Sequence, residues 1–529
     1  MEHKIDRISE LPDPILEHIV SFIPTKQLLQ LSVLSKRWEN VWTLFPIPEF
    51  VQHLFINNLR KVPPNEKEEE IQRKKDEFKS FVERSLRGRH RQRLSINKFR
   101  LHMMLDESDC AIVNRWIDYA IECDVKELNL DLWIHQKRYE LPKKKYELPD
   151  RVLVAKSITE LRLCKCKLKP FYRDINLPSL KKFVLNINVE NQVVQTLIDG
   201  CPNMEEMTFE YCYGLKSIQV SGLPKLMSIE LLRNPQLESV EIEASNLESL
   251  VFKLRIPCQI NLGQCENLKK LVLYSCNITD KWLHEFLSKY PLIDCLDLAN
   301  CSMLERIKIS SNCMKNLTFI SCHRLVEVDI VTPNLHRLEY YGEVISFSLN
   351  SSSPSEVSLI FTGDTDLDAE MIEFLAKLSQ PKLLTWSYFD AKSVITAKNI
   401  REILPSPLYN VKQLKLKACS IPTRQIHELV DVLLWICPLL EVLFIEWRYQ
   451  ETVDSISFKF SYENPIYKLK NPSCCKLLPV LCWRHCVKTI KIENFKGLAE
   501  EKTLTKYFSK NAEILESFHY VKGSALPKV

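Results

Sequence analysis

Residues 204–234 read MEEMTFEYCYGLKSIQVSGLPKLMSIELLRN, and this stretch decides the fold. A six-residue pattern, apolar-x-x-apolar-x-apolar, begins three times within it, at Met204, Leu215 and Leu226. Alternation over the last three positions is typical of a short β-strand with one buried face. The stretch therefore predicts short strands that follow one another closely along the chain.

The same pattern recurs along most of the chain at a regular distance. When the second apolar residue of each main copy is taken as a marker, successive markers lie 21 to 25 residues apart. Stacked coils of that length are typical of a solenoid. The markers are Leu161, Phe183, Met207, Ile229, Leu250, Leu271, Leu296, Leu317 and Leu338.

Five positions after each marker, the residue is usually Cys or Asn, as at Cys166, Cys212, Asn234, Cys301 and Cys322. A coil leaves backbone groups unpaired where its strand ends and turns, and a small polar side chain can satisfy them. The chain has 19 cysteines, an odd number without a secretion signal, which argues against a disulfide framework, and the repeat favours an architectural role for them.

Other copies of the pattern fall between the main ones, and their markers are Ile218, Val240, Ile307 and Val328. Half a coil of ten or eleven residues cannot hold a helix with its connections, so we expect a second strand on the opposite face of these coils. Residues 193–198, 282–287 and 426–433 instead carry an apolar helical stripe, and a proline follows each of them. The pattern predicts a solenoid that mixes α/β and β/β coils.

These observations together resemble the leucine-rich repeat family, with its Leu-x-x-Leu-x-Leu-x-x-Asn/Cys pattern, over much of residues 125–445. The resemblance implies strands that line one face of the solenoid and bind a partner there.

The N-terminal residues 5–46 differ, because apolar residues there recur at helical spacing behind the cap and first-turn residues Asp13 and Pro14. Residues 8–19 and 31–38 resemble the F-box, particularly its plant form. The resemblance implies a three-helix unit that docks onto a Skp-type adaptor and through it onto a cullin-based ubiquitin ligase. The adaptor-binding residues carried over are Leu11, Pro12, Ile15, Leu16, Ile19, Leu31, Val33, Leu34 and Trp38, the last of which could also belong to the core.

The C-terminal residues 487–516 read as a strand and turn followed by a helix, and they resemble the FBD domain of plant F-box proteins with repeats. The predicted organisation is an F-box over residues 1–50, a linker and leading helices over 51–124, a solenoid over 125–465, and a small α+β, FBD-like cap over 466–529. The fold class is α/β.

Residues flanking the markers should point outward from the strands on the concave face. They mix both signs of charge with Val, Ile and Tyr, a composition that suits a protein or peptide ligand better than a polyanion. The candidate target-binding residues are Arg162, Glu230, Val272, Tyr274, Asp297 and Tyr341.

Composition excludes several other functions. Only nine glycines, none clustered, stand among 529 residues, which argues against phosphate-binding loops and nucleophile elbows. A net charge of +5 over this length does not favour nucleic acid, although residues 84–93 and 143–145 are basic. No apolar run reaches the roughly 20 residues needed to span a bilayer.

Cys474, Cys475, Cys482, His485 and Cys486 could be read as a zinc site. Their spacing fits no standard knuckle, so buried cysteines are the preferred interpretation and no metal or cofactor is expected.

The sequence predicts a non-enzymatic substrate-recognition subunit of a Skp–cullin–F-box ubiquitin ligase that holds a protein target. The alternative is a repeat scaffold that binds proteins without directing ubiquitylation. Without a signal-peptide-like start or a membrane span, an intracellular location in the nucleus, the cytoplasm or both is expected.

Overall fold

The chain folds as two compact units, Met1–Leu268 and Lys269–Val529. The computed structural model describes residues 11–12, 15, 18–19, 49–56, 67–91, 94–134, 145–169, 175–254, 258–351, 354–362, 374–375, 377–378, 381–388, 407–418, 426–449, 452–463, 481–493 and 498–521.

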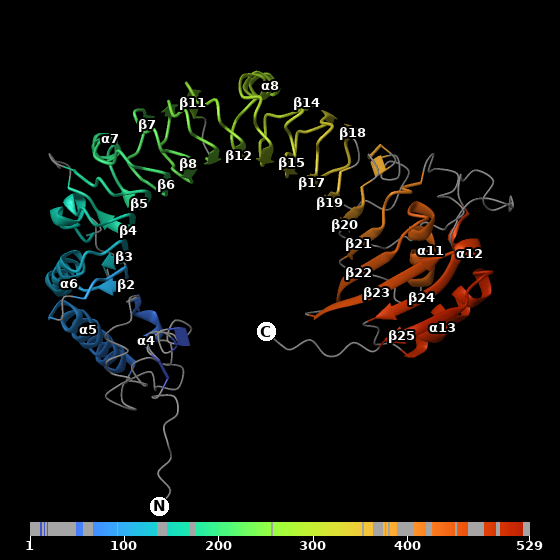
Figure 1. Cartoon of the computed structure of the whole chain (residues 1–529), viewed down its shortest axis with the longest axis horizontal. Coiled ribbons are helices and arrows are strands. Elements are labelled where there is room, and N and C mark those ends of the chain that lie inside the picture. Colours follow the sequence, from blue (N-terminus) through green and yellow to red (C-terminus); the bar gives the residue numbers. More distant parts are fainter. Residues whose placement is uncertain are drawn as a thin grey trace, which may run out of the picture. The chain divides into compact units, whose positions relative to one another are not determined.

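In the N-terminal unit, one long sheet of parallel strands carries the repeat (Figure 1). The markers Leu161, Phe183, Met207, Ile229 and Leu250 lie in register on neighbouring strands and are all buried. The apolar ladder therefore forms a continuous core, as the repeat predicts. The strands in order are β1 (Glu49–Val51), β2 (Lys98–Leu105), β3 (Glu127–Ile134), β4 (Glu160–Lys167), β5 (Lys182–Asn188), β6 (Glu206–Glu210), β8 (Ser228–Leu232) and β10 (Ser249–Lys253).

The opposite side of these coils is closed by helices or by a second set of short strands. Ile218 and Val240, the intermediate markers, lie in register in a separate parallel sheet. The expected β/β coils are therefore confirmed. The strands of this sheet are β7 (Ser217–Val220), β9 (Ser239–Ile242) and β11 (Gln259–Leu262), and the helices and 3-10 turns of the unit are α4 (His53–Ile56), α5 (Lys67–Arg91), η2 (Glu107–Asp109), α6 (Cys110–Glu122), η3 (Asp150–Val154) and α7 (Asn191–Asp199).

The C-terminal unit repeats this plan and then changes it. Its strands run parallel as far as β22, after which β23 and β24 are antiparallel to their predecessors and β25 is parallel to β24. The strands are β12 (Lys270–Tyr274), β13 (Cys295–Ala299), β15 (Asn316–Ile320), β17 (Arg337–Gly342), β19 (Glu356–Phe361), β20 (Leu383–Tyr388), β21 (Gln413–Ala418), β22 (Val442–Tyr449), β23 (Thr452–Tyr462), β24 (Val487–Glu493) and β25 (Ser517–Val521).

A second sheet and several helices complete the C-terminal unit. Ile307 and Val328 lie in register within this sheet, as the intermediate markers predict. The sheet consists of β14 (Arg306–Ser310), β16 (Glu327–Val331) and β18 (Ser346–Asn350), and the helices are α8 (Asp280–Lys289), α11 (Ile426–Ile436), α12 (Trp483–Cys486) and α13 (Leu498–Asn511). Helices α12 and α13 lie with β24 and β25 in the range predicted for the C-terminal cap, whereas the antiparallel β23 lies in the range predicted for the solenoid.

The turn after each strand uses the predicted Cys or Asn position. Asn234 accepts a hydrogen bond from the backbone N–H of Cys212 at 2.9 Å and donates to the Phe209 carbonyl at 2.9 Å. The thiol of Cys212 donates to the Leu185 carbonyl at 3.3 Å. Burial raises the pKa of this thiol to about 12, so it stays a protonated donor at neutral pH. The cysteines are thus architectural at this position.

The residue before this position has a left-handed backbone in coil after coil, which turns the chain away from the sheet. The residues with positive φ at this place are Lys165, Tyr211, Arg233, Ser275, Asn300 and Ser321.

The structure differs from the sequence prediction in residues 51–124, where only a linker and leading helices were expected. Helices α5 and α6 are present, but β2 also lies there, and the parallel sheet begins at Glu49 with β1. The segment KFRLHMML of β2 alternates in burial, with Phe99, Leu101 and Met103 on the core side. The six-residue pattern is also present, at Ile96, Phe99 and Leu101, but Phe99 stands 29 residues before Leu128 of the next strand, outside the 21-to-25-residue spacing of the markers.

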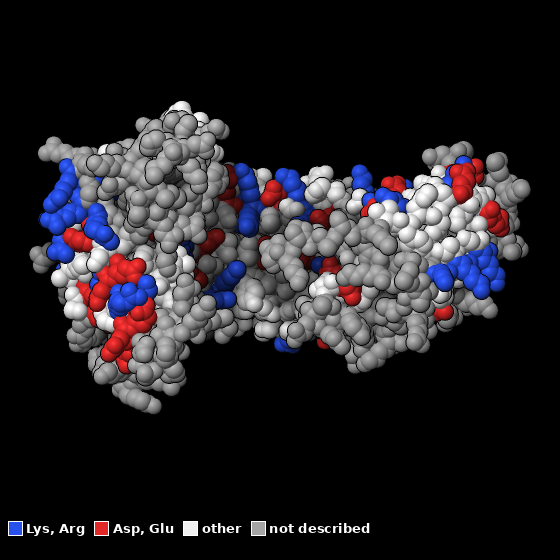
Figure 2. All heavy atoms as spheres, turned by 90° about the horizontal axis from the view of Figure 1, so that it is seen from below, with Lys and Arg blue, Asp and Glu red and all other residues white. Residues whose placement is uncertain are grey.

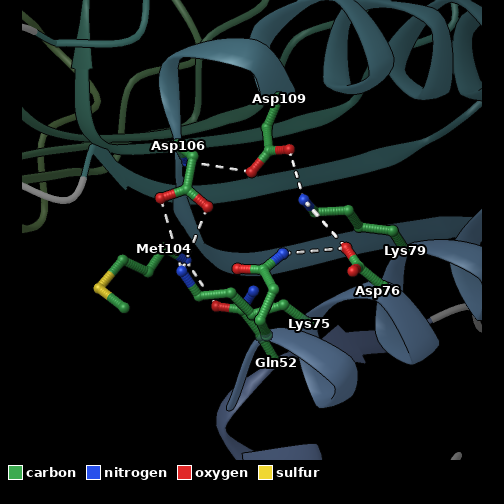
Figure 3. A network of polar contacts seen from close by, with 8 residues as sticks. Gln52, Lys75, Asp76, Lys79, Met104, Asp106 and Asp109 are labelled. Atoms are coloured by element: carbon green, nitrogen blue, oxygen red, sulfur yellow. Dashed lines mark hydrogen bonds and ion pairs between the residues drawn. The ribbon is translucent and has the colours of Figure 1, made fainter. Parts of the chain in front are cut away.

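Helix α5 is fastened to the loop after β2 by a network of charged side chains (Figure 3). The Lys79 ammonium lies 2.7 Å from the Asp109 carboxylate, and Lys75 lies 3.2 Å from Asp106. Asp109 also accepts the backbone N–H of Asp106 at 2.9 Å, and its side chain is only 5% exposed. The network holds the first long helix against the start of the sheet.

Replacing Asp109 by alanine should lower the free energy of unfolding around α5 by about 2–3 kcal/mol, because it leaves a largely buried ammonium and a backbone N–H without their acceptor. Native-state hydrogen exchange of the α5 amides measures this loss. Asp76→Ala is the matched control, since the 61% exposed Asp76 carboxylate lies 3.7 Å from the same Lys79. Equal effects of the two substitutions would contradict the prediction.

Candidate protein-interaction surfaces

Part of the expected F-box docking surface lies among the described residues. Ile15 is 47% exposed, Pro12 is exposed, and Leu11 and Ile19 are half-buried. The backbone N–H of Ile15 bonds to the Pro12 carbonyl at 2.9 Å. Ile15 is therefore a large apolar side chain that faces solvent. The remaining adaptor-binding candidates, Leu16, Leu31, Val33, Leu34 and Trp38, lie outside the described residues.

The strand face of the N-terminal unit is lined by charged side chains that pair across neighbouring strands. Lys98 lies 2.9 Å from Glu127, and Lys182 lies 2.5 Å from Glu206. The hydrogen bond that the Lys182 ammonium donates to the Glu206 carboxylate raises the pKa of Lys182. Figure 2 shows Lys and Arg interspersed with Asp and Glu on the face it presents, with no large field of one sign over the described residues.

Arg162 lines a shallow cavity of about 140 Å³ on this face. It lies in register between Asn129 of β3 and Val184 of β5. The mixture of charged and apolar groups suits a polypeptide surface. The cavity is lined by Lys98, Glu127, Leu128, Asn129, Glu160, Leu161, Arg162, Lys182 and Val184.

The other candidate of the N-terminal unit, Glu230, lies farther along the same face. It is half-buried on β8, and its carboxylate is 3.5 Å from the hydroxyl of Thr208 on β6. Two strands separate Glu230 from Arg162, so the structure does not bring these two candidates together.

The candidates of the C-terminal unit form two neighbouring columns. Val272 and Asp297 face each other in register on β12 and β13, and both are half-buried. Tyr274 and Tyr341 lie two residues farther along their strands, at the position of the next column. Tyr274 is 40% exposed and Tyr341 is half-buried.

Outward direction does not always mean exposure. Val251 was expected to point outward, yet it is only 7% exposed on β10. Its short side chain lies in register with the longer Glu230 on β8. On the face of a sheet, a short side chain beside longer ones is largely covered. The alternation of the strand alone therefore overestimates the exposure of Val251.

Sequence analysis missed a polar and aromatic cluster at the start of this face. His102 of β2 lies 3.3 Å from Asp131 of β3, and its ring centroid is 4.8 Å from that of Trp133. Burial lowers the pKa of the His102 imidazole, while the nearby Asp131 opposes this shift. The alternation of β2 was the signal that could have identified the cluster.

The described members of the Cys-rich segment make separate contacts. The Cys486 thiol bonds to the Cys482 carbonyl at 3.2 Å, and His485 lies 2.9 Å from Glu513. Within the described part of the chain, no group of His, Cys, Asp or Glu is arranged to hold a metal ion. Cys474 and Cys475 lie outside it. No helix among the described residues has the length and apolar character needed to cross a bilayer.

The registered parallel ladder, with its Cys/Asn turns, defines a leucine-rich-repeat solenoid. The family model described as the At1g61320/AtMIF1 LRR domain matches residues 88–265 and 256–518, and the F-box domain model matches residues 8–50. The chain belongs to this leucine-rich-repeat family and carries an F-box.

Several curated plant proteins are similar to this chain. The F-box/LRR-repeat protein At3g03360 of Arabidopsis thaliana is 26% identical over 325 residues, which cover 59% of this chain and 60% of the relative. The F-box/FBD/LRR-repeat protein At4g26340 of the same plant is 26% identical over 313 residues, which cover 58% and 68%. The F-box/LRR-repeat protein At4g14103, also of Arabidopsis thaliana, is 30% identical over 258 residues, which cover 47% and 61%.

The chain spans about half to three-fifths of the length of the first curated relatives it matches. Among solved structures, one described as the crystal structure of a TLR13–ssRNA13 complex aligns with 67% of this chain and 55% of its own, at 14% identity and a TM-score of 0.36. A similarity at that level decides nothing further.

Proposed function

We propose that this chain is the substrate-recognition subunit of a Skp–cullin–F-box ubiquitin ligase. In this role the F-box binds a Skp-type adaptor, which joins it to a cullin, and the strand face of the solenoid binds a protein target. The chain itself is not catalytic. It raises the effective concentration of the target near a ubiquitin-charged enzyme supplied by other subunits. The complex would act inside the cell, in the nucleus, the cytoplasm or both.

The observation that carries the adaptor-binding half of the proposal is the F-box match over residues 8–50, together with an exposed Ile15 within it. An exposed aliphatic side chain in a short helical segment is the type of group that a partner helix buries. Burial of such side chains supplies the driving force for docking.

The last residues of the F-box match belong to the solenoid sheet. Strand β1 begins at Glu49, within the F-box match, and its Glu49 forms an ion pair with Arg100 of β2 at 2.5 Å. Gln52, just after β1, accepts the backbone N–H of Met104 of β2 at 2.9 Å. The solenoid sheet therefore starts where the F-box match ends.

The adaptor-binding half is tested by co-purification with a Skp-type adaptor. The double variant Ile15→Asp, Ile19→Asp should reduce the recovered adaptor at least about tenfold, because it places two charges in an interface that should be apolar. Val154→Asp is the matched control, since Val154 is 45% exposed but lies on η3 of the repeat region. Wild type that recovers no adaptor, or a double variant that recovers as much as the control, would contradict the proposal.

The target-binding half of the proposal is tested by the levels of the proteins that the chain binds, because these levels distinguish ubiquitylation from scaffolding. If the chain directs ubiquitylation, proteins labelled by proximity to it should accumulate under proteasome inhibition, and the double variant should abolish that accumulation while the same proteins stay bound. A scaffold would hold these proteins without any effect of the F-box on their levels. That outcome would favour the alternative.

A further inference from the structure

The strand face of the C-terminal unit carries a row of apolar side chains at one register position. The residues three positions after the marker lie side by side across β12, β13, β15, β17 and β19. We call this row the apolar stripe, and it consists of Tyr274, Ala299, Ile320, Tyr341 and Ile360. Neighbouring strands are about 4.8 Å apart, so its four steps extend over about 19 Å, which equals roughly six residues of extended chain.

The stripe is accessible. Tyr274 is 40% exposed, and Ile320, Tyr341 and Ile360 are half-buried, whereas Ala299 is 7% exposed. The small Ala299 therefore lies between two larger side chains, Tyr274 and Ile320, in the same row. Tyrosine and isoleucine in a continuous row on a solvent-facing sheet form the kind of surface that partners bury.

The corresponding row of the N-terminal unit is different. There the residues at the corresponding register position include the polar His102, Asp131, Asn186 and Glu210, with Leu232 as an apolar exception. The repeat itself therefore does not require apolar residues at this position, since the fold forms equally well with charged ones. Their concentration over β12 to β19 consequently needs a reason other than core packing.

The column beside the stripe supplies a charge. Asp297 lies in register between Val272 and Thr318 and is half-buried. Among the described residues, no ion pair involves it. The other acid of this column, Glu339, lies 3.5 Å from Arg337, which it shares with Glu356 at 3.9 Å. The surface next to the apolar stripe is therefore net negative, and Asp297 is the acid on it that has no ion pair among the described residues; partial burial strengthens its attraction for a cation.

We propose that the apolar stripe and Asp297 bind an extended segment of the target that presents two or three aliphatic or aromatic side chains and one Lys or Arg. The apolar side chains of the segment cover the stripe, and its cation pairs with the Asp297 carboxylate. This inference rests on the proposed function only in taking the bound protein to be the target of ubiquitylation.

The test is a selection of twelve-residue peptides from a random displayed library on the full chain. Peptides selected by wild type should be enriched in Lys or Arg together with Leu, Ile, Phe or Tyr. Asp297→Lys should shift the charged residue of the selected peptides to Asp or Glu. The double variant Tyr274→Ser, Tyr341→Ser should bind the wild-type peptides at least about tenfold more weakly. Circular dichroism confirms that each variant is folded.

Matched controls lie in the other sheet of the same unit. Asp329→Lys makes the same charge change on β16, and Val326→Ser removes a 49% exposed apolar side chain just before that strand. Both should select the wild-type peptides. Enrichment of acidic peptides, absence of any enrichment, or an unchanged basic preference in Asp297→Lys would overturn the proposal. So would a dimer, detected by light scattering, that the tyrosine variant dissociates, since a second copy would then occupy the stripe.

Adaptor co-purification with the same variants separates this proposal from the proposed function. Stripe variants should recover adaptor like wild type. If wild type recovers no adaptor but selects the expected peptides, the ligase assignment fails and the binding site stands. If adaptor is recovered but the peptide outcomes contradict the prediction, only the binding site fails.

Discussion

Replacing Asn234 by alanine will lower the free energy of unfolding of the N-terminal unit by about 3 kcal/mol, because two buried backbone groups lose their partners and each costs about 1–3 kcal/mol unpaired. Asn234 is 1% exposed, and its amide joins the Cys212 N–H to the Phe209 carbonyl. Urea unfolding measures the effect, and hydrogen exchange of the Cys212 amide reports on the turn itself.

Asn246→Ala is the matched control for this prediction. Asn246 donates to the Pro224 carbonyl at 2.6 Å, but its side chain is exposed, so water can replace the bond when the amide is removed. We expect a loss below about 1 kcal/mol there. If the two alanine variants were equally stable, the Cys/Asn position would not be the determinant of the turn that the structure indicates.

The fold was largely predictable because its information is local and repeated. The six-residue pattern placed Leu161 through Leu338 at strand positions, and the register of the parallel ladder confirms each step within the two units. The half-coil argument likewise predicted the strands at Ile218 and Val240. Because the same apolar pattern recurs in many coils, one ambiguous copy does not change the predicted fold.

Strand β2 was missed because it stands outside that repetition. Its alternation is clear, but it follows a 25-residue helix and carries no Cys or Asn at the turn. A single copy of the pattern outside the regular spacing is a weak signal. The cluster of His102 and Asp131 was missed with it, since a cross-strand pair is recognised only when both strands are known.

The sequence predicted which candidate side chains point away from the core, but it did not predict which charged side chains form ion pairs. The alternation along each strand correctly predicted that Arg162, Asp297 and Tyr341 point away from the core. Whether a charged side chain has an ion-pair partner depends on residues of the neighbouring coil. These residues stand more than twenty positions away in the sequence, and the strand register places them side by side. Lys98 pairs with Glu127 and Lys182 with Glu206, 29 and 24 residues farther along the chain, because the register places them on neighbouring strands.

Asp431→Ala should lower the free energy of unfolding of the C-terminal unit by about 3 kcal/mol. Asp431 is a buried carboxylate on helix α11, whose other buried residues are apolar. It accepts hydrogen bonds from the Trp483 indole at 2.9 Å, the Arg484 guanidinium at 3.1 Å and the Tyr507 hydroxyl at 2.8 Å. Burial raises the pKa of Tyr507, so its hydroxyl stays a donor at neutral pH. Removing the shared acceptor leaves a partly buried guanidinium and two donors unpaired.

A graded series separates this network from a general effect on the helix. Asp431→Asn keeps one acceptor oxygen and should cost clearly less than Asp431→Ala, whereas Glu428→Ala on the same helix, at a side chain 46% exposed, should cost below about 1 kcal/mol. Thermal unfolding and the fluorescence of Trp483 report the loss. Because the three donors come from α12 and α13, the carboxylate holds the C-terminal cap against the last helix of the repeats. Alanine and asparagine variants of equal stability would show instead that packing of the cap against α11, without the carboxylate, is enough.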